Sequence, residues 1–248
     1  IEADAKTFAD PRRTLIQEEK KAVAEVKVVD EPVTVVVSEK GWVRARTGHG
    51  HDATSFAFKA GDGLYGTFEC RTVDTLLIFG TAKNGTGRIY SVPVATLPGA
   101  RGDGQPITTL IDLETGTQPA HYFAGPAHAT LLLSGSGGYG FMASVENMIS
   151  RNKAGKAFIS LGDGETICAP SHVSGSSATV PADKQPMPVA NSVCCASTGG
   201  RVLTFEISEL KTMEKGGRGL MLIDLEAKDT LAGAAAYTRS VKIEGIGR

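Results

Sequence analysis

The stretch ATLLLSGSGGYGFMASV, from Ala129 to Val145, decides which fold this chain is expected to adopt. A short apolar run, Ala129–Leu133, leads into a glycine-rich turn, and a second run, Phe141–Val145, follows it. This order predicts two buried strands joined as a hairpin, in which Gly138 adopts the positive φ of a tight turn. The turn also matches G-x-G-x-x-G. Since no helix-forming segment follows it, we interpret the motif as part of the hairpin and not as a dinucleotide site.

The hairpin pattern recurs along the chain. Offsets of 51 and 113 residues align Gly87 with Gly138 and Gly200. The same offsets align four further positions, namely Val94 with Val145 and Ile207, Leu97 with Met148 and Leu210, Gly104 with Gly155 and Gly217, and Ile107 with Phe158 and Leu220. A repeat of about 46 to 62 residues is the size of a propeller blade with four short strands. The sequence therefore predicts an all-β, propeller-like disc over residues 32–248. It should have about five blades, with repeats starting near residues 33, 75, 129, 192 and 237.

Residues 1–31 have a different character. Asp10-Pro11 predicts a helix start, because aspartate is a good N-cap and proline suits the first helical turn. The following residues up to Ala24 are mostly good helix formers with few apolar positions. We therefore expect a helical linker over residues 1–31. The missing initiator methionine suggests a fragment of a longer protein.

The charge of the chain is nearly balanced, with 26 basic and 27 acidic residues. A nucleic-acid-binding domain usually carries a clear excess of positive charge, so the distribution matters more than the sum. Lys83–Gln105 holds three basic residues and one acidic residue, and Arg151–Ser160 holds three basic residues and none that is acidic. The composition is otherwise that of a globular protein, and no apolar run is long enough to span a membrane.

Three glycine-containing basic loops are the candidate binding elements. They are Gly99–Gly104, Asn152–Lys156 and Glu214–Gly219. None contains the G-K-[ST] of a phosphate-binding P-loop. Each places cations at the same point of successive repeats, which could form a positive track for a phosphate backbone. Solubilising turns would have the same composition, and the residues alone leave both interpretations open.

Other reactive residues favour structural roles. His49 and His51 flank a glycine, a spacing more typical of an exposed loop than of a metal site. The four cysteines form no C-x-x-C pair and are expected to be buried thiols in a reducing compartment. Trp42 is expected in the core, with stacking at the rim as the alternative. We find no constellation of acid, base and nucleophile, so no catalytic or metal-binding residue is assigned.

Several stretches of this sequence resemble the C-terminal domains of the A subunits of bacterial type IIA topoisomerases, and topoisomerase IV in particular. The stretches with this resemblance are Glu31–Arg44, Tyr65-Gly66, Gly87-Arg88, Leu97–Gly102, Gly138–Phe141 and Arg151–Lys156, with Asp10–Thr14 similar to the linker that leaves the breakage–reunion domain. The resemblance implies a β-pinwheel, in which neighbouring blades exchange strands and the outer edge binds and bends DNA. A gyrase-type basic box is missing from Thr47–Asp62, which favours topoisomerase IV over a gyrase wrapping domain.

The resemblance also implies partners. We expect contacts to double-stranded DNA, to the rest of the topoisomerase A polypeptide and to the ATPase (B-type) polypeptide, in an A2B2 heterotetramer of the bacterial cytoplasm that is associated with the nucleoid. The holoenzyme of this family uses ATP and Mg²⁺, whereas this domain needs no cofactor. A protein–protein scaffold remains the alternative. Ten cations are expected to face DNA phosphates from exposed loops: Arg44, Arg46, Lys83, Arg88, Arg101, Arg151, Lys153, Lys156, Lys215 and Arg218.

Overall fold

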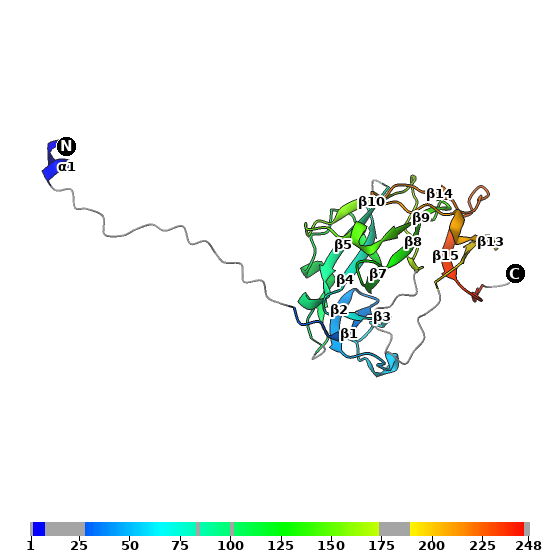
Figure 1. Ribbon diagram of the computed structural model, residues 1–248, viewed down its shortest axis with the longest axis horizontal. Coiled ribbons are helices and arrows are strands. Elements are labelled where there is room, and N and C mark those ends of the chain that lie inside the picture. The colour runs from blue at the N-terminus through cyan, green and yellow to red at the C-terminus, as the bar shows by residue number, and fades with distance from the viewer. Residues whose placement is uncertain (1, 8–27, 83–84, 100–101, 174–188, 246–248) are drawn as a thin grey trace.

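The structure is a computed structural model that describes residues 2–7, 28–82, 85–99, 102–173 and 189–245. Helix α1 covers Glu2–Thr7. Most of the helix predicted over Pro11–Ala24 and most of the loop predicted over Ser171–Pro188 lie outside the described residues. Figure 1 shows the strands grouped into successive small sheets from the N-terminal to the C-terminal part of the domain.

Four antiparallel sheets form the blades of the described domain. Blade 1 has the strand order β3-β1-β2-β6, blade 2 β10-β5-β4-β7, blade 3 β11-β8-β9-β14 and blade 4 β13-β12-β15. The strands are β1 Pro32–Ser38, β2 Trp42–Thr47, β3 Leu64–Arg71, β4 Thr75–Thr81, β5 Thr86–Pro93, β6 Gln105–Pro106, β7 Gln118–Gly125, β8 Thr130–Ser134, β9 Tyr139–Ser144, β10 Lys156–Ser160, β11 Ser171–His172, β12 Ser192–Ser197, β13 Val202–Glu206, β14 Leu220–Met221 and β15 Leu231–Tyr237. Short helical turns lie at Ala53–Ser55 (η1), Val94–Thr96 (η2), Ile107–Thr109 (η3), Val145–Met148 (α2) and Ile207–Glu209 (η4).

The blades exchange strands in the manner of a pinwheel. The outermost strands of blades 1, 2 and 3 are β6, β10 and β14, and each follows the hairpin of the next blade in the chain. The predicted all-β pinwheel is therefore confirmed. The described residues form four sheets, where about five blades were expected. Tyr237 ends β15 in the fourth sheet, so no new repeat starts there.

Two registers of the sequence alignment were wrong. Gly41, Gly138 and Gly200 close their hairpin turns with positive φ, but in blade 2 Gly85 has this role and Gly87 lies within β5. The reason is that the β4–β5 hairpin is longer, since Thr75 pairs with Pro93. The loop before β14 is longer too. The glycine equivalent to Gly104 and Gly155 is consequently Gly219 and not Gly217, and the buried residue equivalent to Ile107 and Phe158 is Leu222 and not Leu220.

The cores lie between adjacent blades. Val35 and Tyr90 belong to the cluster of blades 1 and 2, Phe79 and Phe141 to that of blades 2 and 3, and Val193 to that of blades 3 and 4. Leu97, Met148 and Leu210 are buried at the helical step of each repeat, as predicted. Because each blade covers a face of its neighbour, a single blade could not bury its own apolar residues.

The four cysteines are buried free thiols, as expected. Burial raises the pKa of Cys70 and of Cys195 to about 12. Such thiols stay protonated near neutral pH and are poor nucleophiles. Trp42, in contrast, is only half-buried, and the Lys59 ammonium lies 3.5 Å from its ring centre. The expected core position of Trp42 was therefore wrong, and the alternative of stacking at the rim describes it better.

Candidate nucleic-acid interface

The three basic loops lie at equivalent places on successive blades. After its helical step, the chain of each repeat crosses to the outer strand of the preceding blade, where Ala45 donates its N–H to Pro98 and Met142 donates to Lys211, each at 2.9 Å. The loops then reach Gly104, Gly155 and Gly219, where positive φ brings the backbone against the strand below. A Cβ at these positions would overlap a carbonyl oxygen of β2, β5 or β9, which explains the glycines.

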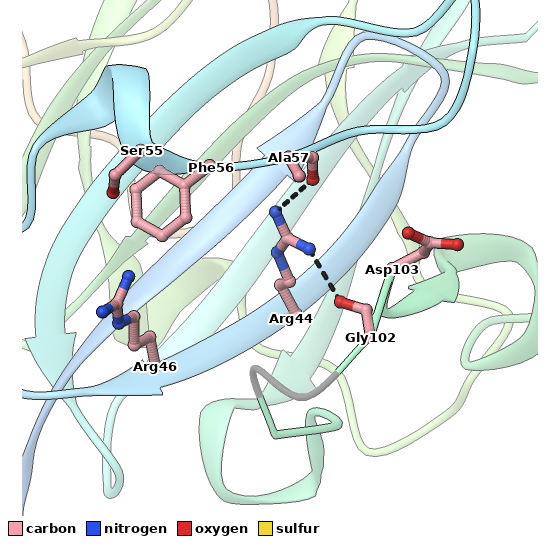
Figure 2. Close-up of a pocket in the computed structure, with 7 residues that line it drawn as sticks. All are labelled: Arg44, Arg46, Ser55, Phe56, Ala57, Gly102 and Asp103. Atoms are coloured by element: carbon pink, nitrogen blue, oxygen red, sulfur yellow. Dashed lines mark hydrogen bonds between the residues drawn. The ribbon is translucent and has the colours of Figure 1, made fainter.

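On blade 1 the loop borders an open hollow with two arginines (Figure 2). Arg44 is buried, and its guanidinium donates to the carbonyl oxygens of Gly102 and Ala57, each at 2.7 Å. Arg46 is exposed and lies with its guanidinium carbon 5.7 Å from the ring centre of Phe56. Arg46 can reach an external anion, whereas Arg44 holds two loops together. The expectation that Arg44 is an exposed loop residue was wrong, because this strand position faces inward and its cation is satisfied by carbonyl groups.

On blade 2 the same division holds. Arg88 pairs with Glu114 at 2.6 Å and donates to the carbonyl oxygen of Ala154 at 2.9 Å. Lys156 donates to the carbonyl oxygen of Asn147, and burial lowers the pKa of its ammonium. The loop between them exposes Arg151 and Lys153, whose side chains make no hydrogen bond or ion pair with the described residues.

On blade 3 the loop exposes Lys215, again without a side-chain partner among the described residues. Arg218 pairs with Glu165 at 2.8 Å, and its guanidinium carbon lies 4.3 Å from the ring centre of Tyr139. Position 139 is equivalent to that of Trp42 on blade 1 and Arg88 on blade 2. An aromatic or charged side chain thus secures the edge of each of the three blades.

The ten predicted cations therefore fall into three groups. Exposed and without a charged partner in the described structure are Arg46, Arg151, Lys153 and Lys215. Engaged in contacts within the domain are Arg44, Arg88, Lys156 and Arg218. Lys83 and Arg101 lie outside the described residues. Sequence reasoning missed Lys59, which covers Trp42 and lies 3.8 Å from Asp103, because nothing in the local pattern connects residue 59 to residues 42 and 103.

No grouping of three or more metal-binding side chains occurs in the described part of the chain. The rings of His49 and His51 bond to the carbonyl oxygens of Cys70 and Thr47, at 2.8 and 2.9 Å. These contacts give both rings a structural role in the blade 1 loop. Among the described residues, no helix is long and apolar enough to cross a membrane.

Comparisons with known proteins agree with this architecture. A family model described as the DNA gyrase C-terminal domain, beta-propeller, matches residues 191–237. The A-type polypeptide of DNA topoisomerase 4 from Neisseria gonorrhoeae is 40% identical over the whole chain, and its counterpart from Escherichia coli K12 is 32% identical over 94% of it. The chain spans 31% and 29% of the length of these two relatives. The solved C-terminal domain of E. coli ParC superposes with a TM-score of 0.70 at 28% identity, covering 84% of this chain and 80% of that one.

Proposed function

Because this chain belongs to the C-terminal domain family of bacterial gyrase and topoisomerase IV A subunits, in its topoisomerase IV branch, we propose that it binds duplex DNA along the outer loops of blades 1 to 3. The contacts are made by Arg46, Arg151, Lys153 and Lys215. Lys83 and Arg101 remain candidates of the same kind. Arg44 is left out, because its guanidinium is already satisfied inside the domain.

The observation that carries this proposal is the repetition of exposed cations on equivalent loops. Each loop is held on the outer strand of a blade, and each presents at least one cation without a charged partner in the described structure. Cations on a curved edge can follow the phosphates of a bent duplex. Phosphate contacts position a protein on DNA but carry no sequence code, so binding should tolerate any sequence.

The near-zero net charge of the domain is compatible with this function. The acidic residues nearest the loops, Glu114 and Glu165, pair with Arg88 and Arg218. Their charge is thereby compensated locally, and the field of the unpaired cations remains. A modest number of phosphate contacts implies weak binding that falls steeply with salt.

The rest of the proposal concerns the whole protein, of which this chain spans about a third of the relatives' length. We place residues 1–31 as the link to a breakage–reunion domain. Two copies of the whole polypeptide would join two copies of the ATPase polypeptide in an A2B2 heterotetramer that uses ATP and Mg²⁺ in the bacterial cytoplasm, at the nucleoid. The domain would help that enzyme to capture DNA crossings for decatenation and supercoil relaxation, and would supply no catalytic residue. The blade 1 segment Thr47–Asp62 lacks a basic box, which favours this role over gyrase-type wrapping.

The test is a salt series of duplex affinity for the 248-residue chain and for the quadruple variant Arg46→Ala, Arg151→Ala, Lys153→Ala, Lys215→Ala. Two duplexes of unrelated sequence should bind equally well. Each phosphate contact contributes about −0.9 to the slope of log K against log[salt], so the variant should bind weakly with a nearly flat slope. In the holoenzyme, the variant should capture crossings poorly while cleaving DNA normally. Unchanged affinity with unchanged melting would favour a protein scaffold instead.

A further inference from the structure

The outer edge of blade 4 differs from the other three. In blades 1, 2 and 3 a segment of the following repeat covers that edge and adds β6, β10 or β14 to the sheet. Blade 4 has the order β13-β12-β15, so β13 is an edge strand in the described part of the domain. An uncovered edge strand offers free backbone donors and acceptors to another extended chain.

The hydrogen-bond register shows which groups of β13 point outward. Ser197 donates its N–H to the carbonyl oxygen of Arg201, which makes this a hydrogen-bonded pair of the β12–β13 ladder. Because such pairs alternate along antiparallel strands, Leu203 and Phe205 also face β12, while Val202 and Thr204 face away from it. Thr204 lies four residues after the turn glycine, as do Ala45 and Met142 in blades 1 and 3. Those two N–H groups bond to Pro98 and Lys211, whereas none of the described residues accepts from Thr204.

The side chains of this edge are also uncovered. Val202 and Leu203 are 51% and 44% exposed. At the equivalent places, Val43 of blade 1 and Phe141 of blade 3 are fully buried. Neighbouring apolar side chains on an unpaired strand carry both elements of strand-addition recognition, namely backbone hydrogen bonds and apolar contact.

The three existing edge segments share one pattern. Each has a glycine followed three residues later by a large buried apolar residue: Gly104 and Ile107, Gly155 and Phe158, Gly219 and Leu222. The glycine is required because the backbone approaches a strand carbonyl group at positive φ. Outside the blades, the sequence has glycines at 175, 245 and 247, and none of them has a large apolar residue three positions later. The chain therefore has no spare segment with this pattern.

We propose that the outer edge of β13 is an acceptor site for an extended segment of a partner protein with the pattern Gly-x-x-apolar. The segment pairs antiparallel with β13, as β6 does with β2 and β14 with β9. It bonds to the outward groups of Val202 and Thr204 and covers Val202 and Leu203. The site lies beyond the three basic loops, so a partner can be held while those loops remain free for DNA.

The first experiment uses a labelled peptide with the sequence of Ser208–Ile223, the segment that covers blade 3, and the full 248-residue chain. We expect saturable binding by fluorescence anisotropy, at least tenfold weaker for the same peptide with Gly219→Val. In the chain, Thr204→Pro should weaken binding about fivefold or more, because it removes one outward N–H. Proline is tolerated at such an edge position, since the lost N–H points away from the sheet.

A second pair of variants guards against a folding defect in Thr204→Pro. Val202→Lys should also weaken peptide binding, whereas the matched control Val189→Lys, at an exposed valine outside the strand, should not. All variants should melt with the parent chain. Equal binding of both peptides, or full binding by Val202→Lys, would overturn the proposal.

Hydrogen exchange distinguishes the other possible occupants. The amides of Val202 and Thr204 should exchange fast in the free monomeric chain and slowly with the peptide bound. Slow exchange in the peptide-free monomer would mean that the chain covers its own edge. Protection that rises with protein concentration, together with a dimer in sedimentation, would mean that a second copy does. Either result contradicts a partner site.

Discussion

The Nη1 group of Arg44 donates a hydrogen bond of 2.7 Å to the carbonyl oxygen of Gly102. Arg44 belongs to β2 of blade 1, and Gly102 to the loop that follows the β4–β5 hairpin of blade 2. This single contact ties the repeats together at the edge where the proposed DNA track begins. It also separates a structural arginine from a binding arginine two residues away in the same strand.

The pair Arg44 and Arg46 gives a matched test of that division. Arg44→Ala should lower the free energy of unfolding by about 3 kcal/mol, because it leaves two buried carbonyl groups without their charged donor. Arg46→Ala should change stability by less than about 0.5 kcal/mol, since its side chain is exposed. Denaturant unfolding of both variants measures this difference. Equal destabilisation would contradict the assigned roles.

Lys153 should contribute one phosphate contact. Lys153→Ala is expected to reduce the salt slope of duplex binding by about one unit and to leave melting unchanged. Lys242→Ala is the matched control, because Lys242 is equally a surface lysine but lies after the last strand, beside Glu244. The comparison fails if both variants alter the slope alike.

Gly155 should tolerate substitution far less well than Gly164, although both have positive φ, +61° and +72°. Gly164→Ala meets open space and should cost about 1 kcal/mol from backbone strain alone. Gly155→Ala adds an overlap with the carbonyl oxygen of Ile89 and the ring of Tyr90, and should cost at least about 3 kcal/mol. Thermal melting of the two variants decides between strain and overlap as the main cause.

His121 makes the stability of the domain sensitive to acid. Its Nδ1 lies 3.2 Å from the Tyr65 hydroxyl of blade 1, and its Nε2 lies 3.2 Å from the carbonyl oxygen of Ile167. Burial lowers the pKa of the ring, so the folded state favours neutral His121. The contribution is complete above the unfolded pKa of about 6.5 and is lost as the pH falls towards the folded pKa.

The measurement is the melting temperature of the parent chain and of His121→Gln between about pH 7.5 and about pH 5, values that lie roughly one unit or more either side of 6.5 and so bracket the titration. The variant should melt lower at neutral pH and lose less stability on acidification. Tyr65→Phe should keep the pH dependence, because it leaves the buried ring in place. Parallel curves for the parent chain and His121→Gln would show that another group carries the effect.

Local patterns in the sequence were enough for the type of fold. The apolar runs on both sides of Gly138 and Gly200, and the buried steps at Leu97, Met148 and Leu210, fall where they were predicted. They could be predicted because a tight turn needs glycine at positive φ and a buried strand needs apolar residues, and both requirements act over a few residues. The alignment slipped at Gly87 and Leu220, where single repeats are longer by two residues. A fixed offset cannot detect such an insertion.

The sequence by itself thus determined an all-β repeat protein with basic loops at equivalent points of its repeats. Only the tertiary structure decided which of those cations are free. Arg44 and Arg46 are both arginines of β2, yet one is buried against Gly102 and Ala57 and the other is exposed at the hollow's edge. The partners of Arg44 come from residues 13 and 58 positions away, and those of Arg88 and Arg218 are similarly distant. Whether a cation is exposed depends on which distant segments fold over it, and this is why composition alone could not separate binding residues from structural ones.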